Sequence, residues 1–553
     1  MAVSPDPTVT GAGHVLIPRH HFRNRPSIGL YQLQTLLLSM MWSLTLGCGE
    51  DVEPAQTSPA TSATEGSEKR TERVDATSPR QKDEFAPLQT SSSADQAQRH
   101  TAGPNVEKSG TTGGDDAVAL KVRLPDDRPD LNDARLAQAG IRRYSSRRLI
   151  LLSDLPEEQV AHLPALADQL FERLELHFGT LPASINDSDF QVTGHLINDQ
   201  QAFHAAGLMP SETFTFDHGR HWNYQFWMFD TEDDYYRRHL LFHEFTHCFM
   251  TCECGMQRLP ASWYMEGMAE YFATHRFTKR NGLSANVEFG VLPQSFEGFE
   301  GWGRISEIRR SFYQNNTAGT PGIRLLTIPT LNAVLPDEAT NFTQYSQYAT
   351  SWAVCWFLQS HPDYRHLYRP LAKLRTRTEI ATAIRQLRRN TRPRINMDWL
   401  LFVESLREDY DVERSFPVHS KTTVTAAELT TGAAKFQLQA ALDWQDSGLR
   451  LKAGESVNVK CTGRFSVNDQ PQLWISEPQG VSIEYVSGLP LGRVVATLVS
   501  DDGESMSSRI SVGTGTTIKA SQNVSVWLQM NDSSASRRNN AGTVNVEFSL
   551  PQL

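Results

Sequence analysis

The feature that most constrains this chain is an apolar helical segment with three polar side chains at its centre. Residues 233–250 open with acidic residues, which favour a helix N-terminus, and continue with closely spaced Leu, Phe and Met residues. His243, Glu244 and His247 interrupt this run as the string HEFTH. Residues four apart share one face of a helix, so both imidazoles can bind one metal ion while Glu244 lies beside it. The segment therefore predicts a buried helix that carries part of a metal site.

A third metal ligand follows at a usable distance. A catalytic zinc site takes a third protein ligand and keeps one position open. Glu266 follows His247 after eighteen residues, at the start of the string EGMAEY, and residues 260–263 (PASW) supply a turn and a new helix start. Because HExxH alone arises by chance in about 3% of chains of this composition, the additional Glu strengthens the metal-site prediction.

Together these residues resemble the gluzincin group of zinc metallopeptidases, whose pattern is HExxH, a spacer and a Glu ligand in a W-x-x-E-G-x-A-E-Y type helix. The resemblance implies that His243, His247 and Glu266 bind zinc and that Glu244 is the general base of peptide hydrolysis. Glu270, one helical turn after Glu266, would orient a ligand histidine or else be an exposed helix acid. The sequence lacks the G-x-M-E-N segment of the aminopeptidases with this spacer, which favours an endopeptidase or an unusual exopeptidase.

A later helix supplies a candidate for oxyanion stabilisation. Residues 345–358 (YSQYATSWAVCWFL) resemble the Y-A-x-S-W-A helix of a bacterial gluzincin-like family of unknown function. Related peptidases place a Tyr near this point, so the resemblance implies Tyr348 as the oxyanion donor, with Tyr345 in reserve. Aromatic residues at helical spacing also suit a hydrophobic core, and both interpretations stay open.

The segments around the site alternate strands and helices over residues 118–416, and the resemblance implies an α+β, zincin-like domain there. The expected strands are residues 147–155, 190–198 and 222–230, and helical spacing covers 156–178. The third strand would pair with an extended substrate or else pack in the core.

Other polar features near the site are predicted to have structural roles. We expect the four nearby histidines to lie on the surface or in loops: His218, His221, His239 and His275. We expect buried or free thiols rather than a disulfide scaffold from the cysteines: Cys48, Cys248, Cys252, Cys254, Cys355 and Cys461. Residues 306–336 carry turn signals and predict a cleft loop or a connector, and the Arg-rich residues 370–411 predict helices with a solvated face.

The pattern of the last part of the chain indicates a second domain. Short alternating segments separated by Gly, Asn, Asp and Ser predict an all-β sandwich over residues 417–553. The expected strands include residues 456–462, 493–498, 523–530 and 543–549. The strings WQDSG (444–448), KAGE (452–455), PLGR (490–493) and VWL (526–528) resemble the bacterial galactophilic PA-I type lectin domain.

One loop of this domain carries the resemblance to a calcium site. Residues 531–542 match the N-D-x6-N-N-x-G loop of the lectins, and hard oxygen donors crowded on one turn suit Ca²⁺. The resemblance implies calcium binding by Asp532, Ser536, Asn539 and Asn540. Asn and Asp in such a turn are also ordinary hairpin chemistry. Residues 468–489, where the lectins hold further sugar contacts, are not similar, so glycan binding and packing on a neighbour both stay open.

The first 117 residues differ from the rest. Residues 19–25 are basic and residues 36–46 are densely apolar, so residues 1–48 predict a signal peptide, with a retained anchor helix as the alternative. The string TLGC ending at Cys48 resembles a bacterial lipobox, which implies a lipid anchor to the membrane; lipidation and simple secretion both stay open. Residues 49–117 hold few large apolar side chains and predict a disordered Ser/Thr/Glu-rich linker.

Composition narrows the classes of function. With 39% hydrophobic and 21% charged residues, the chain is not wholly disordered, collagenous or a polytopic membrane protein. A net charge of −10 without a long basic tract argues against a nucleic-acid partner. We therefore predict an exported zinc peptidase, secreted or held in a bacterial cell envelope, that acts on a protein or peptide. Its lectin-like domain would bind calcium and a glycan or cell-wall polysaccharide. The alternative is a carbohydrate-binding surface protein with a structural zinc.

Overall fold

The computed structural model describes residues 122–551 of the chain, with gaps at 124, 186–187, 211–215, 255–259, 280–284, 293–302, 314–324, 327–330, 332–334, 336–344, 375–376, 408–409 and 413. The predicted signal peptide (1–48) and linker (49–117) lie outside these residues. None of the helices in the described part has the length and the hydrophobicity of a membrane span.

A five-stranded mixed sheet begins the described chain. Its strands are β1 (Arg142–Ser145), β2 (Leu149–Ser153), β3 (Val192–Ile197), β4 (Gly219–Trp222) and β5 (Gln225–Phe229), in the spatial order β1-β2-β3-β5-β4. The three central strands are parallel, and β1 and β4 pair antiparallel at the two edges. The segment predicted as one strand at 222–230 therefore contains the end of β4, a turn and β5. Trp222 ends β4, a turn with Asn223 at φ 46° follows, and β5 lies inside the sheet rather than at its edge.

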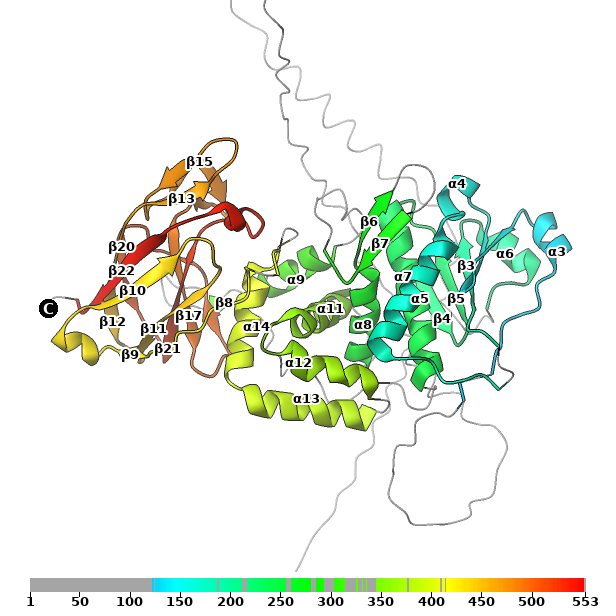
Figure 1. The fold of residues 1–553 in the computed structure, drawn as a ribbon, viewed down its shortest axis with the longest axis horizontal. Helices are drawn as coiled ribbons and strands as arrows, with labels where there is room; N and C mark the ends of the chain where they lie inside the picture. The colour runs from blue at the N-terminus through cyan, green and yellow to red at the C-terminus, as the bar shows by residue number, and fades with distance from the viewer. Residues whose placement is uncertain are drawn as a thin grey trace, which may run out of the picture. The chain divides into compact units, whose positions relative to one another are not determined.

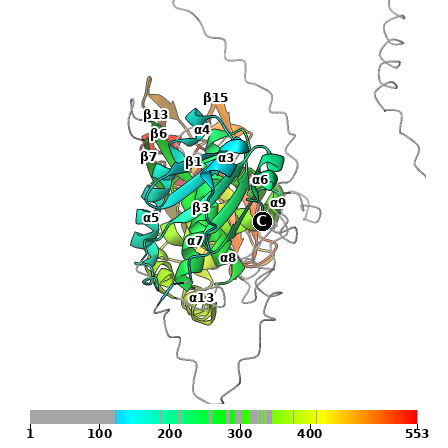
Figure 2. The same ribbon diagram turned by 90° about the vertical axis from the view of Figure 1, so that its right-hand side faces the viewer.

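Helices cover both faces of this sheet and pack apolar side chains against it. Leu149 and Leu151 of β2 belong to the large core that includes α5 (Leu163–Phe178) and α7 (Asp234–Cys254). Ile150 and Leu152 alternate to the other face and pack with α3 (Asp133–Gln138) and α6 (Gln200–Ala206). The layers follow one another from right to left in Figure 1, and Figure 2 looks onto the sheet from the α3 side.

A set of helices follows the sheet. After α7 come α8 (Ser262–Ala273), the hairpin β6 (His275–Lys279) and β7 (Ala285–Phe289), α9 (Arg304–Tyr313), α11 (Tyr345–Ser360), α12 (Arg365–Tyr368), α13 (Arg377–Thr391) and α14 (Arg394–Ser405). The helix α9 and the short strand β8 (Leu325–Leu326) lie where the sequence predicted a loop or connector. The four cysteines whose side chains are described are free and buried, as predicted: Cys248, Cys252, Cys355 and Cys461.

The helices α8 and α11 approach each other closely at one glycine. A Cβ on Gly267 would lie 2.6 Å from the backbone oxygen of Ser351 and 2.5 Å from Sγ of Cys355. Only glycine leaves room for this contact. The position directly after Glu266 is thereby fixed against α11.

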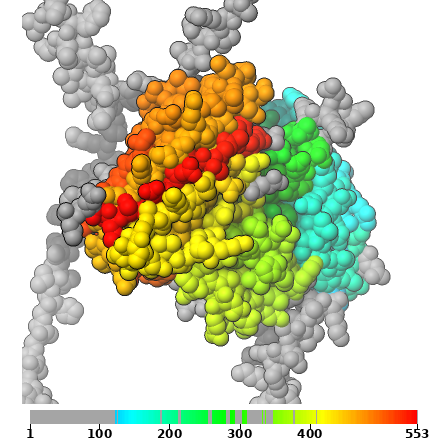
Figure 3. Space-filling view, turned by 60° about the vertical axis from the view of Figure 1, so that its left-hand side comes forward, coloured from blue at the N-terminus to red at the C-terminus, as the bar shows by residue number. Residues whose placement is uncertain are grey.

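The C-terminal part is β-rich, as predicted. One sheet has the order β10-β22-β12-β20, formed by β10 (Ala434–Gln439), β22 (Thr543–Ser549), β12 (Ser456–Thr462) and β20 (Gly515–Lys519). The other sheet is built on β17 (Val494–Ser500), β21 (Val524–Met530) and β11 (Gln445–Leu451). Residues of both sheets form one core. Figure 3 shows β22, in red, running beside β10, in yellow.

Residues of the C-terminal part also belong to the large core. Trp444, Val499 and Trp527 belong to the same hydrophobic cluster as Trp399 and Phe402 of α14. The strand β8 pairs antiparallel with β18 (Met506–Ser507) and so extends the second sheet. The chain on either side of residue 416 therefore packs as one compact unit.

Candidate metal centre

Three predicted ligands converge between α7 and α8. Nε2 of His247 lies 3.0 Å from Nε2 of His243 and 3.1 Å from Oε2 of Glu266, and Nε2 of His243 lies 3.4 Å from the same oxygen. The three side chains are buried. His243 and His247 come from one face of α7, while Glu266 comes from α8, which packs against α7. This arrangement can hold a metal ion.

The spacing of the three donors fits a tetrahedral ion. Bonds of about 2.0–2.2 Å place neighbouring donors of a tetrahedral zinc site about 3.3–3.6 Å apart, close to the observed triangle. Two imidazole nitrogens and a carboxylate oxygen are also zinc's usual ligand types. Donors that converge in this way repel one another unless a cation lies between them. The residues therefore fit zinc, and a fourth ligand from solvent would complete the tetrahedron.

The electrostatics of the group favour a positive charge. Burial lowers the pKa of His243, but the carboxylates of Glu266 and Glu270 outweigh this and raise it to about 10. Burial likewise raises the pKa of Glu266, yet His247 and His243 hold it well below its ordinary value. The two carboxylates therefore favour a positive charge on this group of side chains.

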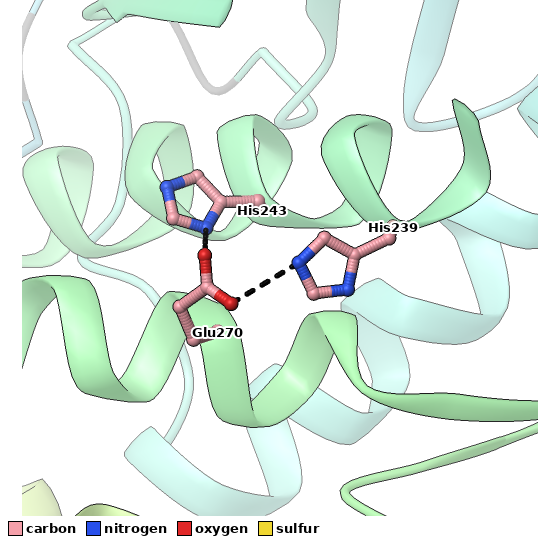
Figure 4. Close-up of side chains that lie close together, drawn as sticks. All are labelled: His239, His243 and Glu270. Atoms are coloured by element: carbon pink, nitrogen blue, oxygen red, sulfur yellow. Dashed lines mark hydrogen bonds and ion pairs between the residues drawn. The ribbon is translucent and has the colours of Figure 1, made fainter. Parts of the chain in front are cut away.

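Glu270 lies behind His243 as the centre of a buried charge network. Figure 4 shows Glu270 of α8 between His243 and His239 of α7. Its Oε1 lies 3.2 Å from Nδ1 of His243, and its Oε2 lies 3.2 Å from Nε2 of His239. Arg304 of α9 donates to both oxygens, at 2.6 and 2.7 Å. Glu270 is 1% exposed, so it is not the exposed helix acid that the sequence left open.

This network argues against a second metal ion there. His239, His243 and Glu270 are close enough to hold one by distance alone. Arg304, however, already places a full positive charge on both oxygens of Glu270. A second cation would be repelled by the guanidinium and would compete with it for the same lone pairs. Glu270 therefore suits the orientation of His243 better than the binding of a metal.

The general-base candidate lies beside the three ligands and contacts the edge strand. Glu244 is buried, and its Oε2 lies 3.5 Å from Nδ1 of His221 on β4. The ring of His221 stacks on His247, with centroids 4.5 Å apart. Burial lowers the pKa of His221 to about 4, so this imidazole is neutral at pH 7.

The prediction of surface or loop histidines is wrong for three of the four residues. His221, His239 and His275 are buried, while His218 is half-buried. The reason is that α7 is enclosed by the sheet, α8 and the β6–β7 hairpin, so polar residues near it are drawn into the core. His239 lies four residues before His243, and this helical spacing could have placed it on the ligand face. Nothing local in the sequence indicated Arg304.

The oxyanion candidate is buried on α11. Tyr348 is 2% exposed and belongs to the large core. It lies one turn before Ser351, whose backbone oxygen faces Gly267 on α8. Its position is therefore compatible with the core interpretation, and its catalytic role stays a prediction. The side chain of Tyr345 lies outside the described residues.

The predicted calcium loop gathers oxygen atoms in the C-terminal part. Asn540 donates to Oδ2 of Asp532 at 2.9 Å, and Asn539 donates to Asn468 of β13 (Phe465–Asn468) at 3.0 Å. The side-chain oxygens of Asn539 and Asn540 have no hydrogen-bond partner within the described part of the chain. Burial raises the pKa of Asp532 to about 6, partly offset by Asn540. Ser536 is exposed at the rim of the loop.

Comparison with known proteins found similar chains among solved structures. No family model matches the sequence, and no curated protein matches it significantly. Among solved structures, one similar chain is described as "EclA N-terminal domain; PllA-like lectin". The similarity has 20% sequence identity and a TM-score of 0.17, and it covers 21% of this chain and 95% of that chain.

Proposed function

We propose that this protein is an exported zinc-dependent peptidase of gluzincin type with a C-terminal part that binds calcium and a glycan. The observation that carries the proposal is the convergence of His243, His247 and Glu266 with Glu244 beside them. Three ligands and a separate carboxylate distinguish a catalytic zinc site from a closed structural one.

Each residue of the site has a separate role in the proposed hydrolysis. His243, His247 and Glu266 would hold zinc. When bound, zinc acts as a Lewis acid and lowers the pKa of a bound water molecule. Glu244 accepts a proton from the attacking water and returns it to the leaving amine. Glu270 holds the ring of His243 through Nδ1, so that Nε2 points toward the other ligands. Tyr348 is the candidate hydrogen-bond donor to the oxyanion.

The edge strand supplies a place for the substrate. Within the described residues β4 is an edge strand that pairs with β5, and an extended peptide would add along its other edge. Its residues Gly219 and His221 lie directly beside Glu244. A peptide paired along β4 would present a carbonyl next to the proposed base. This assigns the substrate strand to β4 and not to β5.

Replacement of Glu244 tests the enzyme proposal. Glu244→Gln keeps the shape of the side chain but removes its basicity, so zinc content should stay the same while hydrolysis of a mixed peptide library falls by about 10²–10⁴-fold or more. Glu253→Gln, which changes another buried Glu of α7, should retain activity.

Two results would contradict the proposed function. Hydrolysis by Glu244→Gln at the wild-type rate would remove Glu244 from the mechanism. A wild-type protein that binds zinc stoichiometrically but cleaves no peptide of the library would instead favour the alternative, a carbohydrate-binding surface protein with a structural zinc.

Calcium binding is tested at Asp532. Calcium should raise the melting temperature of the wild-type protein, and Asp532→Asn should abolish this rise because the loop loses its only carboxylate. In a chelator at pH 7 the same variant should be more stable than the wild type, by about 1–3 kcal/mol. The sign follows because a raised pKa means that the buried, ionised Asp532 destabilises the fold above pH 6.

The matched control for this experiment is an exposed aspartate. Asp189→Asn changes a side chain at an exposed ion pair with Arg147 and should leave the calcium response intact. An unchanged calcium response in Asp532→Asn, or no response in the wild type, would exclude calcium binding by this loop.

A further inference from the structure

The edge strand β4 contacts both oxygens of the proposed general base. Residues two apart on a strand face the same side, and here Gly219 and His221 both face α7. A Cβ on Gly219 would lie 2.5 Å from Oε1 of Glu244 and 2.9 Å from Cδ1 of Leu240. Nδ1 of His221 lies 3.5 Å from Oε2 of Glu244. The carboxylate thus occupies the space that Gly219 leaves empty, with His221 on its other oxygen.

The ring of His221 is held in this orientation. It stacks on His247 at an interplanar angle of 22°, and the residue is 5% exposed. His221 is not part of the group of donor atoms that can hold one metal ion, which consists of His243, His247 and Glu266. Its Nδ1 faces the carboxylate of Glu244. The geometry therefore connects His221 to the base and not to the metal.

We propose that His221 is a positioning residue that aligns Glu244 by donating the Nδ1 hydrogen to its Oε2. This inference rests on the proposed function, because it assigns how the general base of that reaction is held. A nitrogen–oxygen distance of 3.5 Å is long for a hydrogen bond, but catalytic hydrogen bonds are often long before substrate binds and then shorten. Misplacement of a catalytic group by about 1 Å can cost about 10²-fold in rate.

The proposal gives β4 a second role. The strand that would pair with the substrate also holds the base, through two residues of its inner face. A peptide paired along β4 would therefore be aligned by the same strand that contacts Glu244 of α7. Sites built on strands are held more precisely than sites on loops.

Two variants of His221 test the proposal by kinetics. His221→Ala removes the donor and should lower kcat by about 10- to 100-fold with KM changed less than about threefold. Zinc content should stay the same. His221→Asn retains an N–H near the place of Nδ1 and should recover most of the lost kcat. His195→Asn is the matched control, because His195 is equally buried and stacks on Trp227 away from the site; its kcat should stay within about threefold of wild type.

A structural readout tests the same proposal without activity. In a crystal structure of zinc-loaded His221→Ala, the carboxylate of Glu244 should leave its place against Gly219, and in His221→Asn it should return. An unmoved carboxylate in His221→Ala would overturn the proposal, as would an unchanged kcat. Loss of zinc from His221→Ala would also overturn it and make His221 a ligand. Failure of the wild type to cleave any peptide would count against the proposed function alone, because the position of Glu244 is still measured.

Discussion

Glu270 is the negatively charged centre of the buried network behind His243. Its carboxylate accepts hydrogen bonds from Nε and Nη2 of Arg304. The same carboxylate lies 3.2 Å from Nε2 of His239 and 3.2 Å from Nδ1 of His243. Burial raises its pKa, but Arg304 and His239 hold the pKa well below the ordinary value. Glu270 therefore stabilises the fold above the ordinary Glu pKa, and this stability is lost as the pH falls toward the lowered pKa.

Replacement of Glu270 should affect both stability and metal affinity. In Glu270→Gln, Arg304 is left buried without its anionic partner, so the free energy of unfolding should fall by about 3–5 kcal/mol. Zinc affinity should fall by about 10–100-fold, because His243 loses the group that orients its ring. Urea unfolding and competition with a chelator measure the two effects.

An exposed ion pair serves as the control for Glu270→Gln. Glu288→Gln removes the partner of Arg276 at 2.9 Å on the β6–β7 hairpin, where Glu288 is exposed. This variant should change stability by less than about 1 kcal/mol and leave zinc affinity intact. Complete loss of zinc in Glu270→Gln with retention in Glu266→Gln would show instead that the ion is held by His239, His243 and Glu270.

At the scale of the elements, local patterns predicted the long helices and several of the strands. The spacing of apolar residues and the acidic start predicted α7, and the turn before Ser262 predicted α8. The strands β12 and β22 have the predicted bounds, at 456–462 and 543–549. These elements could be predicted because side-chain periodicity and turn residues depend only on neighbours in the sequence.

The prediction was wrong for two segments, for different reasons. The helix α9 carries helical spacing in Ile305 and Ile308, which are both buried, but the turn signals around it favoured a loop. The hairpin of β4 and β5 was read as one strand, because aromatic residues continue through the turn at Asn223. The order of the strands could not be predicted, since pairing joins residues distant in sequence.

At the scale of the whole molecule, α14 joins the two parts of the chain through buried polar contacts. Arg509 donates to both oxygens of Glu404 at 2.7 and 3.1 Å, and the indole of Trp444 donates to Glu404 at 3.0 Å. Ser405 donates to Asp443, which also pairs with Arg537 of the predicted calcium loop at 2.8 Å. The candidate metal centre and the predicted calcium loop therefore belong to parts that share a core and a polar network.

This contact predicts that the two parts unfold together. Burial raises the pKa of Glu404, but Arg509 outweighs this and lowers it to about 2, so the pair contributes at neutral pH. Glu404→Gln should lower the free energy of unfolding by about 2–4 kcal/mol and shift one common transition. Far-ultraviolet circular dichroism follows the helices, and tryptophan fluorescence includes the C-terminal Trp444 and Trp527.

An exposed pair again provides the comparison. Asp189→Asn breaks the ion pair between Asp189 and Arg147, whose side chains are both exposed, and should leave the free energy of unfolding nearly unchanged. Two separate transitions, of which Glu404→Gln lowers only one, would contradict a single cooperative unit.

The sequence by itself was enough to name the candidate ligands. Helical spacing placed His243 and His247 on one face of a helix, and the resemblance to the gluzincin pattern implied Glu266 on a second helix. Only the tertiary structure decided what surrounds them: His221 beside Glu244, Arg304 on Glu270, and Gly267 against α11. These contacts join residues on different strands and helices, and their geometry depends on how whole layers pack, which no local pattern encodes.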